Sequence, residues 1–158
     1  MKTAIFSSVF FLFVFSLFSQ SKKEIKKYKI KSTSVQVTEN GKTLSDGKKV
    51  YYSDGEVSEE TTNNDDGTLK KRTTFKYNEK GDVTEEVEYD AKNALTEKKV
   101  TTYNLLGEKE FEMVYDSKNS LVKKHQYIYD KKGLKTERKT FDGAGKQISS
   151  RKFIYEFK

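Results

Sequence analysis

The sequence predicts an all-β protein, an antiparallel up-and-down meander of repeated hairpins that forms an open, twisted sheet of about ten strands after a signal peptide. One observation is an aromatic residue that recurs in alternating steps of 12 and 14, a full period of 26, at Tyr77, Tyr89, Tyr103, Tyr115, Tyr129, Phe141 and Tyr155. A second is that Asp or Asn follows each of the first six aromatics, and that Gly or Asn comes three positions later. The absence of Pro suits a chain that is mostly hydrogen-bonded sheet.

The N-terminal segment, residues 1–19, has the layout of a secretory signal peptide. A basic start at Lys2 precedes an apolar run of Phe, Val and Leu, and the small and polar residues Ser19, Gln20 and Ser21 follow it. The run is short for a membrane span, although an uncleaved anchor is the alternative. We expect cleavage close to Ser19 and an exported mature chain that is periplasmic, outer-membrane-associated or extracellular. Residues 20–36 are then a lead-in strand, and residues 37–158 are the hairpin repeat domain.

Each repeat unit ends in a predicted hairpin turn. Counting back from Tyr77 by the same steps extends the units to Val37, and the fifth position of all nine units is then Gly or Asn, namely Gly41, Gly55, Gly67, Gly81, Asn93, Gly107, Asn119, Gly133 and Gly145. These two residue types tolerate a positive φ best. Asp or Asn opening a type I turn, with a left-handed residue closing it as a bulge, is a common hairpin connection.

The segments between turns, about eight residues each, are rich in Thr, Val, Tyr, Lys and Glu. Both steps are even, and side chains alternate between the faces of a sheet with a period of two. From Tyr51 onward every aromatic residue except Tyr52 has an odd number. We therefore expect one face of the sheet to carry the aromatic row and the other face to carry mainly charged residues.

The unit Tyr129-Asp130-Lys131-Lys132-Gly133 resembles the YD repeats of RHS-type proteins, and weaker units begin at Tyr77, Tyr89, Tyr115 and Phe141. The similarity covers about residues 51–155. The chain departs from that family in its alternating spacing and in lacking the usual Arg after the Gly. The segment 51–55, Tyr-Tyr-Ser-Asp-Gly, is similar to the short repeats of MORN and antitoxin-like proteins. Both resemblances imply a scaffold or binding role, and neither brings a catalytic residue.

No constellation of residues predicts an enzyme, a cofactor or a metal site. The chain has no Cys, and its single histidine, His125, follows two lysines without a second ligand or a nucleophile nearby in sequence. The acids of the turns lack the closely alternating oxygens of a calcium loop, so we interpret them as turn residues. Paired glutamates such as Glu85 and Glu86 fit a solvated strand face better than catalytic carboxylates.

Charge is distributed unevenly along the chain. Residues 21–50 carry a net charge of +6, residues 51–90 carry −7, residues 91–116 carry −1 and residues 117–158 carry +8. The basic C-terminal strands predict a patch for an anionic glycan, lipid head group or other polyanion, formed by Lys131, Lys132, Lys135, Arg138, Lys139, Arg151 and Lys152. Nucleic acid is not expected. The alternative is charge that keeps the sheet soluble and discourages pairing at its edges.

One predicted turn has an apolar tip. Leu105 and Leu106 occupy the positions that hold Glu79 and Lys80, or Lys131 and Lys132, in other units. These leucines either fold back onto the rim of the sheet or mark a contact with a partner, most simply another envelope protein. The sequence therefore favours a non-enzymatic, exported β-repeat protein that acts as a scaffold or protein-interaction module in the bacterial cell envelope. The alternative is a binder of polyanions through the C-terminal strands.

Overall fold

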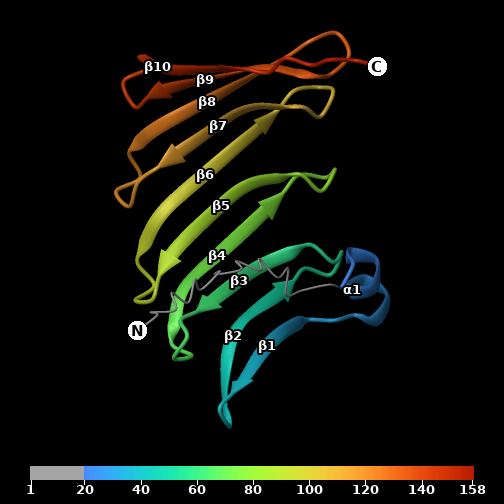
Figure 1. Ribbon diagram of the computed structural model, residues 1–158, viewed down its shortest axis with the longest axis vertical. Helices are drawn as coiled ribbons and strands as arrows, with labels where there is room; N and C mark the ends of the chain where they lie inside the picture. The colour runs from blue at the N-terminus through green and yellow to red at the C-terminus, as the bar shows by residue number, and fades with distance from the viewer. Residues whose placement is uncertain (1–19) are drawn as a thin grey trace, which may run out of the picture.

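The computed structural model describes residues 20–158, so the predicted signal peptide at residues 1–19 lies outside the described part. Ten strands form one antiparallel sheet in sequence order, which confirms the predicted all-β meander (Figure 1). The strands are β1 (Ser32–Glu39), β2 (Lys42–Tyr51), β3 (Val57–Asn63), β4 (Leu69–Tyr77), β5 (Val83–Asp90), β6 (Leu95–Tyr103), β7 (Lys109–Tyr115), β8 (Leu121–Tyr129), β9 (Lys135–Asp142) and β10 (Gln147–Lys152). The strand direction turns steadily from β1 to β10, as the right-handed twist of strands requires.

The lead-in segment differs from its prediction. Residues 20–36 are not one strand, because helix α1 occupies Lys22–Tyr28 and β1 begins only at Ser32. Ser21 and Glu24 form a capping box at the start of this helix, and Lys29 ends it in the left-handed conformation. Ile25 of this helix is fully buried, and the ion pair between Lys22 and Glu56 joins α1 to the segment directly before β3.

The hairpin turns are built as the sequence predicts. All nine fifth positions of the units have a positive φ, between 59° at Asn119 and 91° at Gly55. In six successive turns the side-chain Oδ1 of the opening residue accepts hydrogen bonds from the backbone N–H groups two and four positions later. These six residues are Asn78, Asp90, Asn104, Asp116, Asp130 and Asp142. The four aspartates among them therefore serve as turn residues, and one carboxylate oxygen of each accepts from the backbone of its own turn.

A β-bulge follows each of these turns. In the β4–β5 hairpin Tyr77 pairs with Val83 but Lys76 pairs with Glu85, so Thr84 is an extra residue on β5. The same shift leaves one extra residue on each strand from β3 to β10, in the same alternating steps of 12 and 14, at Ser58, Lys70, Thr84, Thr96, Glu110, Val122, Thr136 and Ile148. Where this residue is Thr84, Thr96 or Thr136, its hydroxyl donates to a carbonyl of the preceding strand.

The bulges overturn the expectation that all large rings share one face. Directly opposite residues of an antiparallel pair lie on the same face. Phe75 is opposite Glu86 and Tyr89 is opposite Arg72, so these two odd-numbered rings lie on opposite faces. The rings of β4, β6 and β8 lie on one face, and those of β5, β7 and β9 lie on the other. The period-two rule holds within a strand, but the extra residue at every hairpin reverses the parity from one strand to the next.

The sheet is a single layer with a thin core. In the described part of the chain, the buried apolar side chains are Ile25, Val87 and Val114, and the buried polar ones are Thr73, Thr101 and Thr140. Nearly all other strand positions are half-buried or exposed. Rings and long charged side chains that lie across neighbouring strands therefore supply most of the side-chain packing.

Candidate interaction surfaces

The turns lie in two rows, one along each end of the strands. We call the row formed by turns 52–55, 78–81, 104–107 and 130–133 the tyrosine rim. It lies at the right of Figure 1, next to α1. The opposite rim carries the β1–β2 turn and turns 64–67, 90–93, 116–119 and 142–145. Because consecutive strands are antiparallel, every second turn of the sequence falls on the same rim.

Tyrosine hydroxyls fasten the tyrosine rim. Four tyrosines donate a hydrogen bond to the backbone carbonyl of the residue 20 positions earlier, with oxygen–oxygen distances of 2.8–3.0 Å. The pairs are Tyr77 with Val57, Tyr103 with Val83, Tyr129 with Lys109, and Tyr155 with Lys135. Each tyrosine reaches the start of the strand that follows the previous turn on that rim, so consecutive turns are tied together.

The turns of this rim also contact one another through side chains. Lys80 Nζ lies 3.8 Å from the position that a Cβ atom on Gly107 would take, and Glu108 Oε1 lies 3.0 Å from the equivalent position on Gly133. Turns 78–81, 104–107 and 130–133 are thus neighbours in space although a full repeat period separates each from the next in sequence. Consecutive turns of one rim are two strands apart, about 9–10 Å.

The predicted partner-binding pair, Leu105 and Leu106, lies at the tip of the third turn of this rim. Their exposed fractions are 98% and 82%, so neither leucine folds back onto the sheet. The turn beneath them is fixed, because Asn104 Oδ1 accepts the N–H groups of Leu106 and Glu108 and the Asn104 amide donates to the Glu108 carboxylate. The two apolar side chains are therefore presented to solvent on a well-defined turn.

The residues predicted to bind a polyanion do not form one patch. Lys135, Arg138 and Arg151 share a face of the sheet, whereas Lys139 and Lys152 lie on the other face beside Glu137. On that second face Lys139 Nζ is 3.8 Å from a carboxylate oxygen of Glu137. Lys131 and Lys132 belong to neither face, because they form the exposed tip of turn 130–133 on the tyrosine rim. The structure thus divides the predicted site among three places.

Two arginines face each other on the first of these faces. Arg138 is directly opposite Arg151 on one side and Tyr127 on the other, and its Nε is buried without a hydrogen-bond partner in the described residues. The neighbouring Lys135 Nζ lies 5.4 Å from the ring centroid of Tyr127 and 5.0 Å from that of Phe153. Like charges directly opposite one another are unfavourable unless an anion or a ring compensates them.

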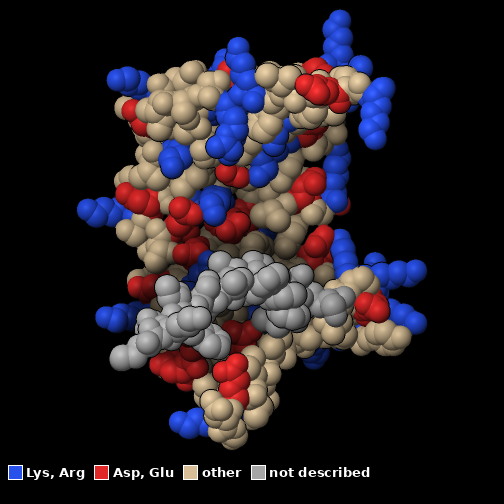
Figure 2. All heavy atoms as spheres, in the orientation of Figure 1, with Lys and Arg blue, Asp and Glu red and all other residues tan. Residues whose placement is uncertain are grey.

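Ion pairs compensate the acidic middle of the sheet better than its basic end. Carboxylates of β3 and β5 pair with Lys71, Arg72, Lys76 and Lys99 at 2.7–3.2 Å. Among described residues after Asp116, the one ion pair is the long contact between Lys139 and Glu137. Figure 2 shows lysine and arginine side chains gathered over the upper part of the molecule, where β8–β10 lie.

His125 lies on β8, on the same face as Arg138. Its Nδ1 is 3.0 Å from the Thr140 hydroxyl, and its register partner on β7 is Glu112. Burial lowers the pKa of His125, although the Glu112 carboxylate acts in the opposite direction. The residues placed around it are a threonine, a glutamate and basic side chains.

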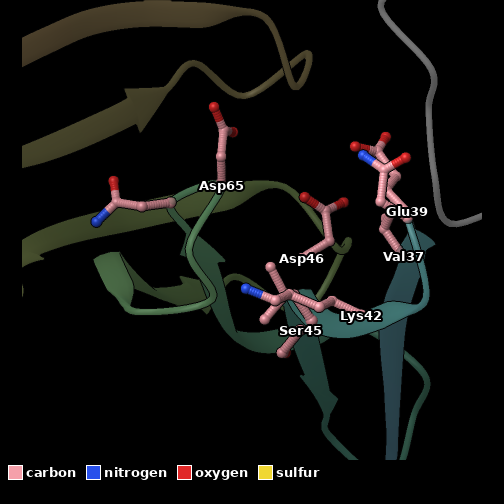
Figure 3. A pocket seen from close by; sticks show the side chains of 9 residues that line it. Val37, Glu39, Lys42, Ser45, Asp46 and Asp65 are labelled. Carbon is pink, nitrogen blue, oxygen red and sulfur yellow. The ribbon is translucent and has the colours of Figure 1, made fainter.

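A hollow of about 630 Å³ lies between turns at the β1–β2 and β3–β4 connections. Its carboxylates come from Glu39, Asp46 and Asp65, with Lys42 as the basic member (Figure 3). The sequence alone does not reveal it, because no single segment carries the lining residues and each turn acid by itself indicates only a turn. In the described part of the chain, no group of three or more Asp, Glu, His or Cys is placed to hold a metal ion.

Within residues 20–158 no helix is long and apolar enough to cross a membrane. No protein-family model matches the chain, and neither does any curated protein sequence.

Several solved structures match the chain at low similarity. A porin-like protein from Bacteroides uniformis is 14% identical with a TM-score of 0.41, over 78% of this chain and 49% of that one. A protein with unknown function from Bacteroides fragilis is 17% identical with a TM-score of 0.39, over 80% of this chain and 96% of that one. TarM from S. aureus, solved as a mutant in complex with Fondaparinux, alpha-GlcNAc-glycerol and UDP, is 12% identical with a TM-score of 0.33, over 79% of this chain and 22% of that one. This chain thus spans less than half the length of TarM and about half that of the porin-like protein.

Proposed function

We propose that this protein is a non-enzymatic, exported β-repeat module that acts as a scaffold in the bacterial cell envelope, and that Leu105 and Leu106 make its contact with an envelope partner. The observation that supports this best is the near-complete exposure of both leucines on a turn that is fixed by side-chain hydrogen bonds. Exposing two large apolar side chains is unfavourable unless a partner covers them. A single-layer sheet with both faces accessible suits a role in which surfaces rather than a pocket do the binding.

The test is a photo-crosslinking residue placed at Leu106 in the full chain, expressed with its own N-terminus in a bacterium. We expect adducts in the envelope fraction, and no adducts when the same residue replaces Lys92, which occupies a tip of the opposite rim. Retention of the chain in the cytoplasm would overturn the export. An envelope chain without adducts at Leu106 would overturn the contact.

A second candidate function is the binding of an anionic glycan or another polyanion by the β8–β10 face, and the direct opposition of Arg138 and Arg151 favours it. An anion held between the two guanidinium groups would relieve their repulsion. The test is retention on heparin at low salt. We expect retention to fall in Arg138→Gln with Arg151→Gln and to remain in Lys92→Gln with Lys118→Gln on the opposite rim.

A further inference from the structure

The structure brings together two groups of residues that the sequence assigns to different roles. The leucine tip and the first two members of the predicted polyanion site, Lys131 and Lys132, occupy consecutive turns of the tyrosine rim. On the other side of the leucines, turn 78–81 places Lys80 against Gly107. Two exposed leucines therefore stand between exposed lysines, each group about 9–10 Å from the next.

From this arrangement we infer that the tyrosine rim binds the surface of an anionic lipid bilayer. Leu105 and Leu106 enter the boundary between head groups and acyl chains. Lys80, Lys131 and Lys132 contact the lipid phosphates. The inference rests on the proposed function only in that export places the protein beside a membrane.

A lipid surface fits this rim better than a protein does. A stable protein–protein interface buries about 800 Å² on each partner, which a projecting tip of two leucines does not supply. Peripheral membrane binding needs only a few apolar side chains that reach the acyl boundary and basic residues at head-group level. The rim has both. Glu108 and Asp130 accept hydrogen bonds within their own turns, which fixes these carboxylates but leaves their negative charge in place. Asp82 follows turn 78–81 directly, so the lysines act through their exposed positions at the tips and not through a net positive charge of the rim. Glu79 is the remaining exposed acid at the tips of these three turns.

The rigidity of the rim strengthens the inference. The Tyr103 hydroxyl bonds to Val83 and the Tyr129 hydroxyl bonds to Lys109. These hydrogen bonds hold the bases of turns 104–107 and 130–133 in place. A preorganised tip loses little conformational entropy when it inserts. More of the favourable free energy of transferring its leucines into the bilayer is therefore retained as binding affinity.

The experiment is co-sedimentation of the full chain with vesicles of equal parts phosphatidylcholine and phosphatidylglycerol, and with vesicles of phosphatidylcholine alone. We expect binding to the anionic vesicles that falls at least about tenfold in Leu105→Ser with Leu106→Ser. Charge removal in Lys131→Gln with Lys132→Gln should weaken it about 25-fold, since each lysine near an anionic surface contributes about fivefold. Both variants alter exposed turn tips, so their melting curves should match the parent.

Matched controls lie at the opposite rim. Lys92→Gln with Lys118→Gln removes two tip lysines from turns of the same design, and Ile148→Ser removes an exposed apolar side chain beside that rim. Neither should change vesicle binding. Equal loss in these controls, or equal binding to neutral vesicles by all variants, would overturn the inference, because the attachment would then lie elsewhere in the chain.

A second readout places the tip directly. The chain has no cysteine, so Leu106→Cys can be labelled at one position with an environment-sensitive dye. We expect a blue shift with the anionic vesicles and none for the dye at Lys92→Cys. No shift at Leu106 would overturn the lipid inference. If Leu106 then still gave protein adducts in the envelope, the proposed function would stand with a protein as the partner.

Discussion

The Tyr103 hydroxyl donates a 2.9 Å hydrogen bond to the carbonyl oxygen of Val83, which lies on the preceding strand and 20 positions earlier in the chain. Tyr77, Tyr129 and Tyr155 repeat the same bond in their own units. The bond joins the base of one turn to the base of the previous turn on that rim. In a sheet with almost no second layer, it is a tertiary contact that links one hairpin to the next.

Replacing Tyr103 with Phe removes this bond and keeps the ring. We expect the free energy of unfolding to fall by about 1 kcal/mol, the usual net contribution of a hydrogen bond. Tyr103→Ala should cost a few kcal/mol, because the ring is lost as well. Denaturant unfolding measures both. Tyr115→Phe is the control, since the Tyr115 hydroxyl lies 3.7 Å from the weakly accepting sulfur of Met113. A similar loss in both Phe variants would contradict the role assigned to the Val83 bond.

Asp130 opens its turn by accepting the N–H groups of Lys132 and Leu134. Asp130→Ala should destabilise the protein by about 1–2 kcal/mol, because both donors lose their partner. Asp130→Asn keeps an oxygen in the same place, as Asn78 and Asn104 do in their turns, and should be nearly neutral. Thermal melting of the two variants separates the hydrogen-bonding role from a role of charge.

Ile25 is the one fully buried large apolar side chain in the described residues. Ile25→Ala should lower the free energy of unfolding by about 2–5 kcal/mol. Because α1 is only two turns long, it has little stability of its own and should unfold when this buried side chain is lost. Amide exchange of residues 22–28 would report the unfolding of α1, whereas protection of β5–β8 should persist. Unchanged exchange in the helix would contradict this role of Ile25.

Burial raises the pKa of Tyr77 to about 12, and the carboxylate of Glu56 acts in the same direction. The unfolded chain releases this proton near pH 10, before the folded protein does. The contribution to stability is therefore present below pH 10 and is lost as the pH rises toward 12. Absorbance titration of tyrosinate should show a late-titrating group that is absent in Tyr77→Phe. Complete tyrosine ionisation near pH 10 with the fold intact would contradict the expectation.

His125 should make the protein sensitive to mild acid. Burial lowers its pKa, so the unfolded chain binds a proton near pH 6.5 before the folded protein does. Stability is then lost as the pH falls through 6.5 toward the lower folded value. His125→Gln should show less loss of melting temperature between pH 7.5 and pH 5.5 than the parent. An identical loss in both would assign the effect to other groups.

The sequence predicts the hairpin turns residue by residue but places the rings wrongly. A turn is local chemistry, so Asn78 and Gly81 are enough to define one from the sequence. The face of a ring depends on pairing between strands, and the extra residue at Thr84 changes that pairing. The lead-in strand is present only from Ser32 onward, because α1 occupies Lys22–Tyr28. The capping pair Ser21 and Glu24 is a sequence signal for that helix start.

The candidate interaction site at Leu105 and Leu106 was likewise only partly predictable from the sequence. The unusual tip at Leu105 and Leu106 is visible in the sequence, because the units compared with it carry charged residues at those positions. Its exposure, and the closeness of Lys80 and Lys132, required the structure. The spacing of one full period between these tips is also visible in the sequence. The tips lie on the same rim because consecutive strands are antiparallel.

The sequence by itself determined the meander, its period and the conformation of each turn, because these depend on a few neighbouring residues and on the φ angles that Gly and Asn tolerate. The tertiary structure decided which side chains share a face, which turns share a rim, and that Leu105 lies beside lysines from other hairpins. These relationships depend on register across strands, and a single extra residue in a hairpin moves the later side chains of that strand to the opposite face.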